Sequence, residues 1–185
     1  MVPLIETARL RLREFKESDL EPQAATLRDE EVVRYLGGRP HSREDAWRRM
    51  LAARGLLEML GYGYWCVERR EDGAYLGQVG FADYKRDMKP CIEGLPEIGW
   101  IFAPHAQGRG YANEAVAAAI AWADDTLGRR ELVAIISHGS AASIRVAEKA
   151  GFSIREEAVY NGEPILLFRR PALPAPAATA SAASA

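Results

Sequence analysis

The chain has 185 residues, of which 24 are basic and 26 acidic, and its formal net charge is −2. This balance gives no electrostatic basis for nucleic-acid binding, and no apolar run is long enough to span a membrane. The N-terminus lacks a basic region followed by an apolar one, and Cys66 and Cys91 show neither a disulfide nor a metal-ligand pattern. We therefore expect a cytoplasmic protein without a metal or a membrane partner.

A hydrophobic content of 48% over this length is enough for one domain with a sizeable core, which we place at residues 1–170. Residues 9–15 alternate charged and apolar side chains, which predicts a half-buried strand with Leu10 and Leu12 on the core face. Ser18-Asp19 is predicted to begin a helix that is interrupted along its length and stops before Gly37-Gly38-Arg39-Pro40.

A second helix is predicted to begin at Ser42, because Asp45 lies three residues later and completes a capping-box pattern. The two helices would form a hairpin. The second helix also carries basic side chains that could attract an acidic acceptor, but acidic neighbours at Glu44 and Glu58 favour a solvated face. These basic residues are Arg43, Arg48, Arg49 and Arg54.

Aromatic and β-branched residues at 62–68 and 74–81 predict two antiparallel strands, joined by a hairpin turn at Asp72-Gly73. Residues 83–96 are polar and contain two prolines, which predicts a mostly exposed loop that could border an acceptor site. Residues 97–102 predict the next strand, and Gly99 within it indicates a bulge or a close backbone approach.

Residues 107–112 join that strand to a long alanine-rich helix, which is predicted to end at Gly128. Gly108 and Gly110 lack side chains that would keep a ligand away from the backbone. The helix that follows presents unpaired N–H groups and the positive end of its dipole. This combination predicts a site for a phosphate or pyrophosphate.

The apolar run at 131–136 predicts a strand buried on both faces and parallel to the strand before the helix. Ser137 or Ser140 would cap a further helix that runs to Lys149. Residues 152–170 then predict a terminal β-hairpin that turns at Asn161-Gly162. Alanine, proline and serine dominate residues 171–185, where we expect a disordered low-complexity tail.

Three motifs carry a resemblance to a known family. Gln107-x-x-Gly110-x-Ala112 resembles the acyl-coenzyme A signature of the GNAT superfamily of N-acetyltransferases. The segments 7–13 and 142–152 resemble the ribosomal-protein N-terminal acetyltransferase branch, so that the likeness covers roughly residues 7–170. It implies an α/β fold whose mixed, mostly antiparallel sheet contains a splayed parallel strand pair flanked by helices. It also implies transfer from acetyl-CoA to a primary amine, on a protein N-terminus or a small molecule.

The resemblance also implies roles for individual residues. Backbone groups near Trp100, Ile101 and Phe102 would bind pantetheine and polarise the thioester. Ser140 stands where many relatives carry an asparagine that contacts pantetheine. The two helices of the first hairpin would flank the acceptor channel, so we expect the segment around residues 34–42 to govern substrate choice. The pyrophosphate would lie against the phosphate-binding segment, which comprises Gln107, Gly108, Arg109, Gly110, Tyr111 and Ala112.

Catalysis would need a base for the acceptor amine and a proton donor for the thiolate. By resemblance, Glu97 is the base, acting through water, although an ordinary strand-end carboxylate is an equal alternative and His138 is a competitor. Many relatives place a tyrosine where this chain has Ala147. Ser143 is the substitute we consider, with an ordinary helix hydroxyl as the alternative.

Other interpretations account for fewer of these features. Covalent catalysis by Cys66 or Cys91 lacks a nearby activating base. A dinucleotide or nucleoside-triphosphate site lacks its glycine and Gly-Lys-Ser/Thr patterns. A non-catalytic acyl-CoA-binding sensor stays open, as does the choice between a monomer and a homodimer.

Overall fold

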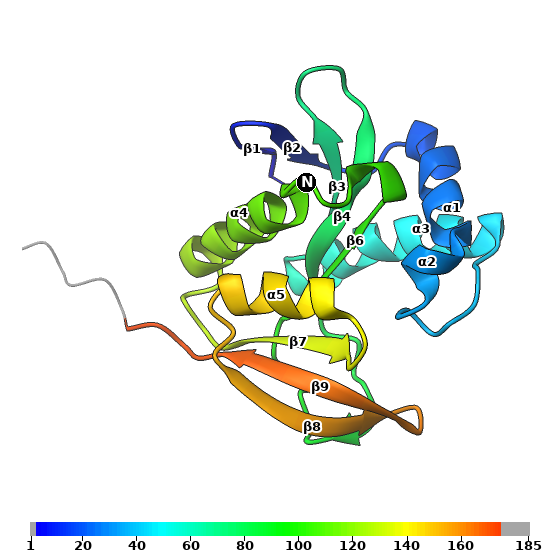
Figure 1. The fold of residues 1–185 in the computed structure, drawn as a ribbon. Coiled ribbons are helices and arrows are strands. Elements are labelled where there is room, and N and C mark those ends of the chain that lie inside the picture. Colours follow the sequence, from blue (N-terminus) through cyan, green and yellow to red (C-terminus); the bar gives the residue numbers. More distant parts are fainter. Residues whose placement is uncertain (1–2, 175–185) are drawn as a thin grey trace, which may run out of the picture.

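The computed structural model describes residues 3–174, which form one nine-stranded sheet flanked by helices (Figure 1). The strands are β1 (Ile5–Glu6), β2 (Leu10–Arg13), β3 (Tyr64–Arg69), β4 (Tyr75–Ala82), β5 (Met88–Lys89), β6 (Glu97–Phe102), β7 (Leu132–Ser137), β8 (Ile154–Tyr160) and β9 (Glu163–Arg170). The α-helices are α1 (Leu20–Arg28), α2 (Glu30–Val33), α3 (Arg43–Leu60), α4 (Tyr111–Thr126) and α5 (Ala141–Lys149), and two short 3-10 helices are η1 (Glu17–Asp19) and η2 (Pro104–Ala106).

The sheet order is β1-β2-β3-β4-β6-β7-β9-β8-β5, and among these pairs only β6 and β7 run parallel. They meet at a single register position, Glu97 opposite Val133, where the Val133 N–H donates to the Pro96 carbonyl at 3.1 Å. Beyond this point β6 pairs only with β4 and β7 only with β9, so the two strands diverge (Figure 1). The predicted fold class, including the splayed parallel pair, is confirmed.

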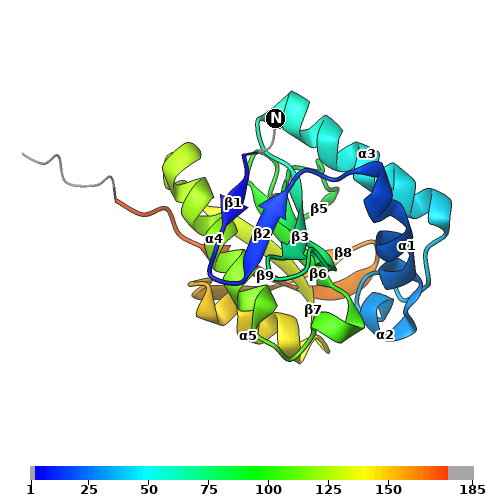
Figure 2. The ribbon, with the colours of Figure 1, turned by 90° about the horizontal axis from the view of Figure 1, so that it is seen from above.

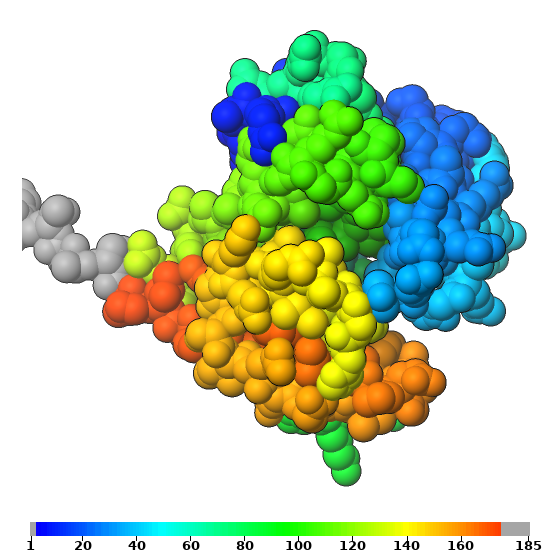
Figure 3. All heavy atoms as spheres, viewed as in Figure 1, coloured from blue at the N-terminus to red at the C-terminus, as the bar shows by residue number. Residues whose placement is uncertain are grey.

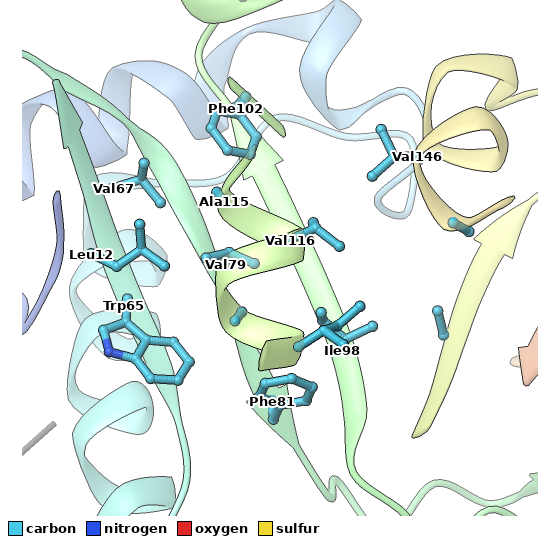
Figure 4. Packing of buried hydrophobic residues seen from close by; sticks show 14 of the residues in the cluster. Leu12, Trp65, Val67, Val79, Phe81, Ile98, Phe102, Ala115, Val116 and Val146 are labelled. Atoms are coloured by element: carbon cyan, nitrogen blue, oxygen red, sulfur yellow. The ribbon is translucent and has the colours of Figure 1, made fainter. Parts of the chain in front are cut away.

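Helices cover both faces of the sheet, with α4 and α5 on one side and α1 to α3 on the other (Figure 2). The main core lies between the sheet and α4, where Trp65 and Phe81 are fully buried (Figure 4). Trp122 of α4 packs edge-on against Trp65 with ring centroids 4.9 Å apart. Leu10 and Leu12 are also fully buried, so the core face of the first long strand was predicted correctly.

A buried polar cluster links the start of α1 to the face of the sheet opposite α4. Arg13 of β2 donates to both carboxylate oxygens of Asp19, at 2.7 and 2.9 Å, and to Glu68 of β3 at 2.5 Å. Burial raises the pKa of Asp19, but the hydrogen bonds from Arg13 and the Lys16 backbone outweigh it, so that the pKa of Asp19 is lowered. The ion pair is therefore fully formed at neutral pH.

Asp19→Asn is expected to reduce the free energy of unfolding at pH 7 by on the order of 3 kcal/mol, because Arg13 loses a charged partner. A carboxylate with a lowered folded-state pKa stabilises the protein above its unfolded pKa and loses this effect as the pH falls through the folded value. The difference between the two proteins should therefore shrink below about pH 4 in urea titrations. Exposed Asp125→Asn is the control, and an equal loss at pH 3 and pH 7 would contradict the ion-pair explanation.

Local signals placed several helix ends and turns correctly. Ser42 and Asp45 form the predicted capping box at the start of α3. The Asn161-Gly162 turn joins β8 to β9, with positive φ at both residues. The arginines of α3 are exposed, in agreement with the solvated face, and Arg48 pairs with Glu44 at 2.5 Å.

Other predictions need correction. The first helical region is interrupted, as predicted, at Asp29, whose extended backbone separates α1 from α2, but α2 ends earlier than expected, at Val33. Residues 83–96 are mostly loop, as predicted, but the loop is less exposed than expected. The two-residue strand β5 pairs with β8, and the apolar side chains of Met88 and Ile92 are buried against neighbouring strands of the sheet. Amphipathic alternation is too short there to reveal a two-residue strand.

Gly99 causes no bulge, since β4 and β6 keep one register along their whole length, and the shift in the sheet lies between Val67 and Glu68 instead. Residues 171–174 continue from β9, and the Leu173 N–H donates to the Arg129 carbonyl at 2.9 Å. The rest of the predicted tail, from residue 175, lies outside the described residues. Among residues 3–174, no helix has the length and apolar character needed to cross a membrane.

Candidate active site

The divergence of β6 and β7 creates an opening in the middle of the sheet. Along the β6 edge that faces it, backbone N–H and C=O groups beyond Glu97 have no strand partner. Side chains alternate across β6, so Glu97, Gly99 and Ile101 face α1 to α3, whereas Trp100 and Phe102 face α4. A ligand lying in the opening would thus meet backbone rather than side chains along this edge.

The wide end of the opening lies beside the start of α4. Gly110 is the N-cap, with φ at 78°, and has no side chain with which to cap the helix. The first backbone bond runs from the Glu114 N–H to the Gly110 carbonyl at 3.2 Å, which leaves the N–H groups of the preceding turn without a helical acceptor. A Cβ on Gly108 would meet nothing within 4 Å, so this residue borders open space. An anion could meet uncapped N–H groups here, and the binding of a pyrophosphate by this segment stays a prediction.

Arg9, from the connection between β1 and β2, braces the phosphate-binding segment. Its guanidinium donates to the Arg109 carbonyl at 3.0 Å, pairs with Glu114 at 2.7 Å and lies over the Tyr111 ring at 4.7 Å. From the sequence, Arg9 was predicted only to lie in a strand. Its role depends on a contact across 100 residues of chain, for which no local pattern exists.

Gln107 has a bracing contact as well. Its side-chain nitrogen donates to the Phe102 carbonyl at 3.1 Å, linking the end of β6 to the turn before α4. The side chain thus fixes the shape of the segment, whereas the backbone of residues 108–112 faces the wide end of the opening. The space-filling view shows a hollow between this green segment, the yellow start of α5 and blue α2 (Figure 3).

Asn113, in the first turn of α4, was missed by the sequence analysis. Its Oδ1 is buried and has no hydrogen-bond partner among the described residues. A buried, unpaired amide oxygen is costly unless a ligand or water supplies a donor. This oxygen is enclosed by protein, so it does not test the fit of a cofactor. The uncapped N–H groups at the start of α4 and the unpaired backbone edge of β6 do fit the phosphates and amide groups of coenzyme A.

On the other side of the opening, α5 carries the two predicted serines. Ser140 is the N-cap and is buried, but its side chain makes no capping bond, so the predicted helix-capping contact is absent. Ser143 is partly buried, and no described residue hydrogen-bonds its hydroxyl. Ala147, one turn further along, is fully buried against the main core. Ser137, the other capping candidate, instead donates to the Tyr35 carbonyl at 3.3 Å.

Glu97 lies at the narrow end of the opening and is 7% exposed. Arg86, from the loop after β4, donates to both of its carboxylate oxygens, at 2.6 and 2.8 Å. The Arg86 guanidinium also lies over the rings of Tyr84 and Tyr160, 4.9 and 4.6 Å from their centroids. Burial opposes its charge, yet the bonds to Glu97 raise the pKa of Arg86 above its usual value. Each carboxylate oxygen keeps a second lone pair that could contact water.

The competing residues have other partners. His138 pairs with Glu157 of β8 at 2.8 Å, which holds its ring toward the outer strands. Cys66 is fully buried, and burial raises the pKa of its thiol, which disfavours the reactive thiolate. Cys91 is exposed. Within residues 3–174 no cluster of three potential metal ligands occurs.

Comparison with known proteins decides the family. A model described as an acetyltransferase (GNAT) domain matches residues 9–153. The chain belongs to the GNAT acetyltransferase family. The predicted recognition and enzyme class, an acetyl-CoA-dependent acyltransferase, are therefore confirmed.

Individual relatives agree with this assignment. The uncharacterized N-acetyltransferase YoaA of Bacillus subtilis (strain 168) is 28% identical over 169 residues, covering 89% of this chain and 93% of YoaA. A solved structure described as a GnaT-family acetyltransferase from Bordetella pertussis has a TM-score of 0.78 and 29% identity, covering 91% of this chain and 99% of that one.

A third comparison concerns the cofactor. The ribosomal L7/L12 N-terminal acetyltransferase RimL, solved in complex with coenzyme A, has a TM-score of 0.73 over 91% of this GNAT chain and 98% of RimL. Its identity is 18%, so the likeness is one of fold. GNAT proteins use acetyl-CoA, and a protein of this fold has been seen with coenzyme A.

Proposed function

We propose that this GNAT protein transfers an acetyl group from acetyl-CoA to a primary amine by direct attack of the amine on the thioester. The observation that carries the proposal is the single-pair contact between β6 and β7, with the uncapped start of α4 at the wide end of the resulting opening. This arrangement joins an anion site to an unpaired strand edge, which is what a pyrophosphate followed by an amide-containing arm requires.

The cofactor would be held mainly by backbone. The N–H groups of Tyr111 and Ala112 would bind the pyrophosphate, and the free β6 edge at residues 100–102 would bind pantetheine and polarise the thioester carbonyl. Ser140 offers a hydroxyl at the start of α5, on the other side of the opening. Acetyl-CoA supplies the acyl group in its thioester-activated form.

Glu97 is proposed to accept the amine proton through a water molecule, since it lies on the face of β6 turned toward α1 to α3. As the C–N bond forms and the C–S bond breaks, the sulfur gains a proton, for which Ser143 is the candidate donor. A thiolate needs modest help because the reference pKa of a thiol is about 8.5. The acceptor is proposed to be a protein N-terminus or a small-molecule amine.

An acceptor screen tests the function. The protein would be incubated with acetyl-CoA and a panel of peptides with different N-terminal residues, amino acids and polyamines, while free thiol is measured and products are identified by mass spectrometry. Acceptor-dependent thiol release with an acetylated amine is expected. Coenzyme A binding without thiol release for any amine would favour the acyl-CoA sensor instead.

A further inference from the structure

Tyr64 reaches across three strands to the centre of the candidate site. Tyr64 of β3 is opposite Gly80 of β4, and Gly80 is opposite Gly99 of β6. A Cβ on Gly80 would lie 2.8 Å from the Tyr64 Cγ, and a Cβ on Gly99 would lie 2.5 Å from the Tyr64 hydroxyl oxygen. Two glycines facing each other in register therefore leave a furrow in the sheet that the Tyr64 side chain occupies.

The furrow sets the position of the phenol oxygen. It ends at Gly99, two residues from Glu97 on the same face of β6 and directly before the 100–102 segment that we assign to the thioester. Tyr64 also lines a pocket of about 190 Å³, whose other walls include Phe15, Trp47 and Met50. A ligand on this side of the sheet can therefore come close to Tyr64.

The chemistry of the hydroxyl suits binding rather than proton transfer. Burial raises the pKa of Tyr64 well above its usual value, so it stays a neutral phenol at physiological pH. The neighbouring Tyr84 phenol adds to this rise in the pKa of Tyr64, after burial, and the Tyr84 ring lies against Arg86. A hydroxyl has one donor and two acceptor positions, so the Tyr64 oxygen can accept a hydrogen bond from an N–H group.

We propose that the Tyr64 hydroxyl accepts a hydrogen bond from the acceptor amine and orients it toward the thioester beside Gly99. This inference rests on the proposed acetyl transfer and adds a substrate-contacting residue to it. A suitable acceptor is an amine that keeps an N–H group to donate to Tyr64 while its nitrogen lone pair points at the thioester carbonyl.

Tyr64→Phe keeps the ring and removes the hydroxyl. We expect kcat/KM for the amine to fall by about tenfold, which corresponds to the loss of a single hydrogen bond. Coenzyme A affinity and melting temperature should change little. Tyr62→Phe, which removes the hydroxyl of another buried tyrosine on the main-core side, is the control and should keep wild-type kcat/KM.

Gly99→Ala provides a second, independent variant. Its methyl group would displace the Tyr64 oxygen, whereas in the Tyr64→Phe background the nearest ring carbon would be at 3.5 Å, an ordinary contact. Gly99→Ala should therefore reduce kcat/KM strongly in the wild-type background and little in the Tyr64→Phe background. The double variant should match Tyr64→Phe alone.

The outcomes separate the two levels of inference. Wild-type kcat/KM in Tyr64→Phe for an amine that the wild-type protein acetylates would overturn the role of Tyr64 and leave the proposed function intact. Additive effects of the two substitutions would overturn it as well. Absence of any amine acetylation by the wild-type protein would overturn both proposals.

Discussion

Glu97→Gln is expected to lower turnover by about 10²–10⁴-fold, while the affinity for coenzyme A changes little. The substitution keeps the shape of the side chain but removes the basic oxygen that is proposed to receive the amine proton. Single-turnover measurements would separate this effect from product release, and calorimetry would report cofactor binding.

The ion pair with Arg86 makes a stability control necessary. Glu97→Gln leaves the Arg86 guanidinium without its charged partner, so the melting temperature should fall as well. Asp124→Asn is a matched control, because Arg170 donates to both oxygens of Asp124, at 2.9 and 2.6 Å, at the far end of α4. It should lose stability and keep turnover.

The pH dependence gives a further test of the base. An amine acceptor is increasingly deprotonated as the pH rises, so the enzyme contributes less by removing its proton. The deficit of Glu97→Gln should therefore shrink at high pH if chemistry limits turnover. Single-turnover rates of Glu97→Gln near the wild-type value would favour His138 as the base. A loss of coenzyme A affinity as large as the loss of turnover would show that Glu97 has a structural role.

Gly110→Val is expected to weaken coenzyme A binding by about 10- to 100-fold. At a φ of 78° a β-branched residue is strained by about 1–3 kcal/mol, so the turn before α4 should rearrange and shift the N–H groups of Tyr111 and Ala112. Losing one charge-assisted hydrogen bond of about 1.5–3 kcal/mol accounts for a change of this size, at about 1.4 kcal/mol per tenfold.

Gly128→Val is the matched control for this experiment. Gly128 has a φ of 77° and open space around its Cβ position, but it follows the opposite end of α4. Both variants should lose similar stability, and only Gly110→Val should lose affinity in calorimetry. Unchanged affinity in a folded Gly110→Val protein would remove the start of α4 from the proposed cofactor site.

The sequence by itself determined the parts that depend on neighbours in the chain. Alternation placed β2 and its buried leucines, the strand of residues 97–102 matches β6, and the glycines around α4 marked the helix start that faces the opening. The continuous apolar run predicted that β7 is parallel to β6. These signals are local because backbone conformation and strand or helix periodicity are set within a few residues.

Only the tertiary structure decided which side chains meet in the site. Arg86 folds back from a loop onto Glu97, Arg9 crosses to the start of α4, and Tyr64 lies over two glycines that belong to different strands. Each contact depends on strand register or on the path that a connection takes over the sheet. Neither of these produces a periodic pattern in the sequence from which it could be predicted. A one-residue change of register would turn Gly80 away from Tyr64 and close the furrow.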